Sequence, residues 1–290
     1  MGEHLDPRPL LRQLARNSTP YQDPLNRIRW ELLDDDPRPW LPPAAVSLHG
    51  VAEFEALAEE QRHALARYEF LHIIEGALWL EALFMVRISR ALLRRREDEV
   101  HALYHLHELR EEAGHSLVFL ELRQRAGPLV PHSAFNRFDL PNLFARATPF
   151  SSVAFWTAVL MGEEIPDRLN RFIRSRREAV NPAIFDIVTM HLIDEARHIA
   201  HARNTVERGL GALSHWRKAL YRPLVNRAFT QFVRRFFYPP AQVYELAGLA
   251  PGRTWAQRAW DNPERRAFVD GCVGSSMRTL RELGIPLAWR

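Results

Sequence analysis

Two Glu-x-x-His motifs, separated by 83 residues, constrain the fold of this chain more than any other feature. The first motif is Glu112 with His115, and the second is Glu195 with His198. Residues three apart lie on the same face of an α-helix, so each motif can supply one wall of a buried metal site. The equal separation of both pairs indicates an internal duplication of a helical segment.

The second motif carries an additional histidine. In the segment MHLIDEARHIAHAR, residues 190–203, His191 precedes Glu195 by four positions. An α-helix turns by about 100° per residue, so positions 191, 195 and 198 fall within an arc of about 60°. By the 83-residue separation His191 corresponds to Glu108, which is not a histidine. A solvated helix face with ion pairs three and four residues apart is the alternative for one such segment, because one helix cannot close a metal site.

The duplication also predicts ligands upstream of each motif. A four-helix bundle that holds two metal ions needs one carboxylate from each of two further helices. Glu81 and Glu164 each lie 31 residues before the glutamate of a motif, and they share the 83-residue separation. Glu81 falls on the apolar face of its segment, where a carboxylate needs a partner such as a cation. We predict Glu81 and Glu164 as ligands, with Glu75 and Glu163 as the alternatives.

The predicted metal site contains four carboxylates and three imidazoles. Oxygen donors with a minority of nitrogen donors and no thiolate favour iron or manganese, and the number of ligands fits two ions. An acid precedes each motif, and we expect Asp194 and Glu111 to accept the second ring N–H of His115 and His198 across the bundle. Solvent-facing charge is the alternative for these two acids. The full set of predicted ligands is Glu81, Glu112, His115, Glu164, His191, Glu195 and His198.

The rest of the chain favours an all-α fold. Period-2 alternation is scarce, whereas helical periodicity runs through residues 54–125, 150–177 and 182–209. Residues 124–142 are predicted to form a long crossover between the two halves. We expect three parts: an irregular N-terminal arm at 1–45, a di-metal bundle at 46–212, and a C-terminal helical extension at 213–290 that packs on the bundle.

Composition excludes several classes of function. The 39 basic residues are balanced by 35 acidic ones, and no long run of like charge favours nucleic acid. The most apolar run, residues 73–88, contains Glu75, Glu81 and Arg87, so it predicts a core helix and not a membrane span. A single cysteine, Cys272, and the absence of an N-terminal signal sequence predict a cytoplasmic protein.

The run HLIDEARHIAHAR, with REEAGH upstream, resembles the ferritin-like di-iron N-oxygenases related to p-aminobenzoate N-oxygenase. The pattern of this family is Glu, Glu-x-x-His, Glu, and then His-x-x-x-Glu-x-x-His, and His191 satisfies its additional histidine. The resemblance covers about residues 60–205 and places the iron ligands on the seven residues given above. It implies a ferritin-like four-helix bundle with a long crossover and additional C-terminal helices.

The resemblance also implies a function. Two Fe ions, with Mn or mixed Mn/Fe as alternatives, would activate O2 so that a monooxygenase oxidises a small-molecule aryl amine through hydroxylamine toward nitro. No flavin or iron–sulfur motif is present, so an external electron donor such as a reductase is expected, and a homodimer is compatible with the chain. Two other functions remain open: a di-metal oxidase, hydroxylase or desaturase acting on another small molecule, and a non-catalytic ferritin-like metal-binding protein.

Overall fold

The computed structural model describes residues 6–93, 98–127 and 146–289, and every regular element within these ranges is helical. The predicted all-α class is confirmed. The predicted crossover, residues 124–142, lies mostly outside the described residues. Four long helices form the centre of the fold: α4 (Glu59–Leu93), α5 (Glu99–Arg125), α7 (Val153–Arg174) and α8 (Pro182–Gly211).

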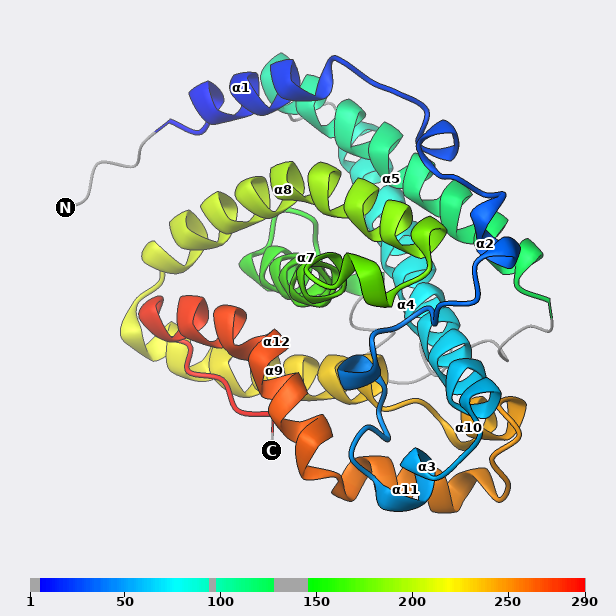
Figure 1. The fold of residues 1–290 in the computed structure, drawn as a ribbon. Coiled ribbons are helices and arrows are strands. Elements are labelled where there is room, and N and C mark those ends of the chain that lie inside the picture. The colour runs from blue at the N-terminus through cyan, green and yellow to red at the C-terminus, as the bar shows by residue number, and fades with distance from the viewer. Residues whose placement is uncertain (1–5, 94–97, 128–145, 290) are drawn as a thin grey trace.

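These four helices form two hairpins. Helix α4 packs along α5, and α7 packs along α8. Three of the helices begin at capping residues: Asp98, Ser152 and Asn181 each accept hydrogen bonds from backbone N–H groups of the first turn, which would otherwise lack partners. Helix α7 continues through Pro166 to Arg174. Figure 1 shows α7 nearly end-on, with α8, α4 and α9 around it.

The interior of the bundle is apolar at its ends and polar in the middle. Leu65, Phe70 and Ile74 of α4 belong to the apolar core, as do Leu160 and Ile184 of the second hairpin. Helix α5 instead buries several charged or titratable side chains, namely His105, Glu108, Glu111, Glu112 and His115. Because ionised side chains are rarely buried without a partner, this middle layer must contain charge pairs or bound cations.

The N-terminal arm is less irregular than expected. It contains the helix α1 (Arg8–Ser18), the short helix α2 (Leu32–Asp35) and the 3-10 turns η1 (Pro24–Arg27) and η2 (Pro43–Ala45). The prediction of an irregular arm is corrected for these segments, which are helical. The apolar residues Leu11, Leu14 and Ala15 have helical spacing, and they form a buried cluster with Tyr104 of α5. Helix α1 packs on α5 (Figure 1). Tertiary contact with α5 thus stabilises a helix whose own sequence is short and polar.

The C-terminal residues form four further helices: α9 (His215–Phe237), α10 (Ala241–Leu246), α11 (Gly252–Asp261) and α12 (Pro263–Glu282). Helices α9 and α12 pack on α7, and α10 packs on α4. Buried Asn262 donates to the carbonyls of Ser47 and His49, which ties the start of α12 to the N-terminal half of the chain. None of the helices in the described ranges combines the length and apolarity that crossing a bilayer requires.

Candidate metal centre

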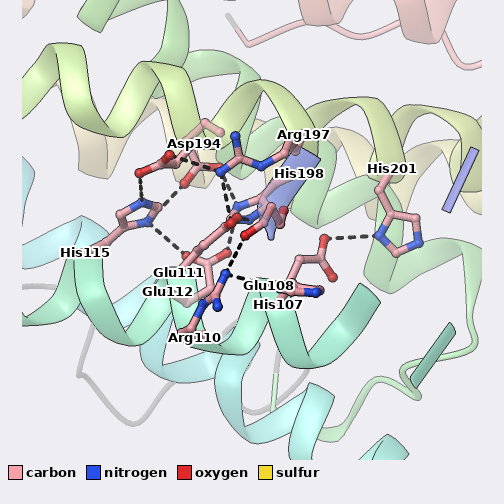
Figure 2. A network of polar contacts seen from close by, with 12 residues as sticks. His107, Glu108, Arg110, Glu111, Glu112, His115, Asp194, Arg197, His198 and His201 are labelled. Carbon is pink, nitrogen blue, oxygen red and sulfur yellow. Dashed lines mark hydrogen bonds and ion pairs between the residues drawn. The ribbon is translucent and has the colours of Figure 1, made fainter. Parts of the chain in front are cut away.

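Six of the seven predicted ligands lie together in the polar middle of the bundle. Glu81 comes from α4, Glu112 and His115 come from α5, and His191, Glu195 and His198 come from α8. All six side chains are buried. Figure 2 shows how α5 and α8 present their acids and imidazoles toward each other.

One group of four side chains surrounds a first point. His115 Nδ1 lies 3.3 Å from Glu195 Oε1 and 3.7 Å from Glu81 Oε1. His191 Nε2 lies 3.4 Å from Glu195 Oε1 and 3.5 Å from Glu81 Oε1. The four ligand atoms all lie within 4.8 Å of one another. Two nitrogens and two oxygens at these separations can bind one divalent ion with small side-chain shifts.

A second group shares residues with the first. His198 Nδ1 lies 3.1 Å from Glu112 Oε1 and 3.1 Å from Glu195 Oε2. Glu195 therefore faces the first point with Oε1 and the second with Oε2. Glu112 also faces both points. Its Oε2 lies 3.3 Å from His115 Nδ1 at the first point, and its Oε1 faces His198 at the second. Two carboxylates in these positions can each bridge a pair of ions.

The structure brings Glu163 of α7, and not the predicted Glu164, toward the cluster. The Glu163 side chain lies close enough to Glu195, Glu112 and Glu81 for these acids to raise its pKa. Glu164 is also buried, but it binds Arg203 and accepts a hydrogen bond of 2.8 Å from Ser276. Neighbouring residues on a helix point about 100° apart, so only one of the two can face the cluster.

The other alternative is resolved in favour of the predicted residue. Glu75 is buried but forms an ion pair of 2.7 Å with Arg123 Nε. Glu81 lies in the cluster of candidate ligands, whereas Glu75 does not. The structure thus places Glu81, the residue predicted from the apolar face of its segment, beside His115, His191 and Glu195.

The crowded carboxylates favour a cation. Burial, followed by the charges of Glu195 and Glu112, raises the pKa of Glu163 well above its ordinary value. Burial and the charge of Glu81 raise the pKa of Glu112 to about 7. Glu112 Oε1 and Glu195 Oε1 are buried without a hydrogen-bond partner among the described residues. Bound metal ions would neutralise these charges and satisfy these oxygens, so the residues present fit a dinuclear metal site.

The acids that precede the motifs act across the bundle. Glu111 Oε2 lies 3.0 Å from His198 Nε2, and Asp194 Oδ2 lies 3.6 Å from His115 Nε2. Each acid faces the ring nitrogen that points away from the cluster, so it favours the tautomer in which Nδ1 is available to a metal. Glu111 forms the expected hydrogen bond with His198, whereas Asp194 lies beside His115 Nε2 without forming a hydrogen bond to it.

Three further residues support the cluster, and the sequence motifs did not reveal them. Arg197 lies 2.9 Å from Glu111 and 3.0 Å from Asp194, so it joins the two acids. Arg27 of η1 forms an ion pair of 2.7 Å with Asp194. The Asn170 amide lies 3.1 Å from His191 Nδ1. Only Arg197 had a local signal, its spacing of three residues from Asp194.

An apolar pocket adjoins the cluster. Its volume is about 600 Å³, and it lies among α4, α7 and α9. Aromatic and aliphatic side chains make up most of its wall, and Glu163 also lines it. Glu163 therefore belongs to both the cluster and the pocket, so a molecule in the pocket can reach the metal site.

The sequence comparison identifies the family. The model of the p-aminobenzoate N-oxygenase AurF family matches residues 7–284 of the chain. This protein belongs to the AurF family. The match extends well beyond the four bundle helices and includes α1 and the C-terminal helices.

Two mycobacterial proteins align with nearly the whole chain. MT0908 of Mycobacterium tuberculosis (strain CDC 1551 / Oshkosh), an uncharacterized protein, is 26% identical over 96% of this chain and 83% of its own length. Mb0909 of Mycobacterium bovis (strain ATCC BAA-935 / AF2122/97), also uncharacterized, is 25% identical with the same coverage.

Solved structures confirm the ferritin-like fold. An R2-like ligand-binding oxidase with an aerobically reconstituted metal cofactor has a TM-score of 0.59 at 13% identity, covering 99% of this chain and 95% of that chain. A glycine-to-leucine mutant of such an oxidase with an Fe/Fe cofactor has a TM-score of 0.58 at 14% identity, with the same coverage. Family membership and the ligand cluster together make this chain a di-metal oxidoreductase.

Proposed function

We propose that this protein is a di-iron oxygenase that uses O2 to oxidise the nitrogen of an aryl amine. The observation that carries the proposal is the pair of ligand groups that share Glu195 and Glu112, beside a pocket lined by Glu163. Membership of the p-aminobenzoate N-oxygenase family supports the choice of an aryl amine.

The donor set supports iron. The proposed ligands are the carboxylates of Glu81, Glu112, Glu163 and Glu195 and the imidazoles of His115, His191 and His198. Oxygen donors with a minority of imidazoles and no thiolate suit iron or manganese better than structural zinc. When bound, iron supplies the redox chemistry with O2.

The residues of the chain orient the substrate and exclude water. Phe84, Phe155 and Phe232 line the pocket and can pack against an aromatic ring. Tyr221 and Gln231 line the same pocket and can hydrogen-bond a polar ring substituent. Because Glu163 marks the wall next to the cluster, we expect the amine to point toward Glu163.

Oxidation of a different bond is the second candidate. The pocket wall is mostly apolar, which also suits a hydroxylase, desaturase or oxidase acting on a C–H bond. A non-catalytic storage role is less consistent with a substrate-sized pocket beside the ligands. Either oxidation requires electrons from outside the chain, for which we propose a separate reductase.

The test is a single-turnover reaction of the full-length protein. Protein loaded with iron and reduced with dithionite is mixed with O2 and p-aminobenzoate or another aryl amine, and products are identified by mass spectrometry. A Glu112→Gln variant, which loses a bridging oxygen, serves as the inactive control. Hydroxylamine or nitro product from wild type alone supports the proposal. Two irons per chain with O2 consumption but no N-oxygenated product from any aryl amine would contradict it.

A further inference from the structure

A second buried cluster lies on the same two helices as the metal centre. It consists of His105 and Glu108 of α5 and His201 of α8. We propose that these three side chains bind a divalent metal ion of their own, separate from the dinuclear centre. The ligand set of two imidazoles and one carboxylate favours Fe2+ or Zn2+ and leaves positions for water.

The geometry suits a metal ion. One ligand atom from each residue lies within 4.8 Å of the other two. His201 Nδ1 is 3.1 Å from Glu108 Oε1, and the rings of His105 and His201 have centroids 5.4 Å apart. In Figure 2 the Glu108–His201 pair is separate from His115 and Asp194 at the other end of the network.

The cluster is distinct from the dinuclear centre. It has no residue in common with either of the two ligand groups described above. Glu108 precedes Glu112 by four residues, and His201 follows His198 by three, which places the cluster about 5 Å further along both helices. One ion cannot bind both sets of side chains.

The Glu108–His201 pair alone leaves a polar atom unsatisfied. Glu108 is buried, and its Oε2 forms no well-aligned hydrogen bond among the residues that the structure describes, although the Tyr104 hydroxyl lies close to this carboxylate. Buried carboxylates are rarely left with an unsatisfied oxygen. An ion between the three side chains would bind this carboxylate and replace the missing interaction.

Rigid aromatic side chains hold the two imidazoles in place. Tyr104 and Trp156 contact His201, with ring centroids 4.8 Å and 4.6 Å from its own. Phe150 meets His105 edge to face at 5.2 Å. Ligands whose orientation is set by packing lose little freedom on binding, which favours metal affinity.

The protonation states also suit binding. Burial raises the pKa of Glu108, but the charge and hydrogen bond of His201 outweigh burial and lower it overall. Burial lowers the pKa of His201. A metal ion replaces the proton of His201 on binding, and a lowered imidazole pKa makes that exchange easier.

The test measures metal stoichiometry of the full-length protein. The protein is stripped with a chelator, equilibrated with excess Zn2+, desalted and analysed for metal per chain. Wild type should retain three equivalents, and Glu108→Gln and His201→Gln should each retain two. The matched control is His101→Gln, a partly exposed histidine on the same helix that pairs with Asp98, and it should retain three.

The variants also separate this site from the dinuclear centre. Glu112→Gln should lower the stoichiometry without removing the ion that Glu108→Gln removes. If wild type retains one equivalent and Glu108→Gln retains none, this inference stands while the dinuclear centre fails. Circular dichroism checks that each variant is folded.

If a variant is unfolded, wild-type protein is instead titrated with Co2+. The visible absorption of bound Co2+ should then saturate at three equivalents per chain.

Two results would overturn the inference. One is that wild-type protein saturates at two equivalents of metal and the Glu108→Gln variant retains the same two equivalents. The other is an unchanged stoichiometry in both the Glu108→Gln and the His201→Gln variants. In either case the three side chains form only a buried hydrogen-bonded network.

Discussion

Glu163 and Glu164 are neighbours on α7, yet they contact different parts of the molecule. Glu163 reaches Glu195 in the metal centre, whereas Glu164 binds Arg203 and Ser276. We therefore propose Glu163 as the ligand from the second hairpin, one residue earlier than a strict duplication requires. The same pair of residues offers a direct test of the proposed ligand set.

Replacing Glu163 with Gln should weaken metal binding, whereas replacing Glu164 with Gln should not. Loss of a residue that only supports a ligand already costs about 10- to 100-fold in metal affinity, so loss of a ligand should cost at least as much. Glu164→Gln should instead lower the free energy of unfolding by about 1–3 kcal/mol, because a buried hydrogen-bonded acid loses its charge. Metal analysis and thermal unfolding of both variants check this. Equal metal content in the two variants would contradict the assignment of Glu163.

Glu111→Gln should reduce metal affinity without disrupting the fold. Glu111 lies 3.0 Å from the ring nitrogen of His198 that points away from the cluster. A Gln oriented as a weaker acceptor should cost about 10- to 100-fold in affinity. Glu121→Gln is the matched control, since Glu121 is on the same helix and pairs only with Arg125 in the contacts shown. Competition with a chelator measures both affinities, and equal values would remove the role given to Glu111.

The metal-free protein should lose stability as pH rises from 6 to 8. Burial and the charge of Glu81 raise the pKa of Glu112 in the folded state to about 7. An unfolded glutamate titrates near about 4.3. The stability that the protonated Glu112 contributes is therefore complete below the unfolded pKa of about 4.3, and it is lost as pH rises through the folded pKa of about 7. The expected loss between pH 6 and 8 is about 1 kcal/mol, at about 1.4 kcal/mol per pKa unit.

Glu112→Gln separates this effect from other titrations, because glutamine resembles the protonated acid at every pH. Urea unfolding of chelator-treated wild type and variant at pH 6 and 8 supplies the comparison. The stability advantage of the variant should be larger at pH 8. A difference that stays constant with pH would show that Glu112 does not titrate in this range.

Gly114→Ala should displace the N-terminal segment from α5. A Cβ atom at Gly114 would lie 2.7 Å from Pro24 Cγ and 2.9 Å from the Tyr21 hydroxyl. The resulting shift should cost about 1–3 kcal/mol of stability and move Arg27 away from Asp194. Gly271→Ala on α12 is the control. It meets nothing within 4 Å, and it should be neutral or stabilising by up to about 1 kcal/mol. Denaturant unfolding ranks the two variants.

Ala158→Trp should block the pocket without affecting the metals. Ala158 lines the pocket but is not among the candidate ligands. The tryptophan side chain should occupy the space of the substrate and reduce product formation at least tenfold. The metal content per chain should stay at the wild-type value. Ala219→Trp, at an exposed position of α9 that does not line the pocket, is the control. Undiminished turnover in Ala158→Trp would place the substrate elsewhere.

Much of this protein is encoded in local spacing. Helix geometry places residues three and four apart on one face, so the motifs on α5 and α8 identified five of the side chains that the structure brings together. Helical periodicity along the chain predicted the all-α class. The apolar face around Glu81 identified a sixth. These inferences need no knowledge of how the helices pack.

Other features depend on contacts between distant segments. The choice of Glu163 over Glu164 follows from Arg203 and from Ser276 in the C-terminal extension, more than 100 residues away in sequence. Helix α1 forms because α5 offers Tyr104, and Arg27 reaches Asp194 only when η1 is in place. Placing the ligand at position 163 or at position 164 changes the local free energy of the helix too little to be visible in a sequence pattern. The partners across the bundle make that difference large, because a buried carboxylate must face either a cation or a donor.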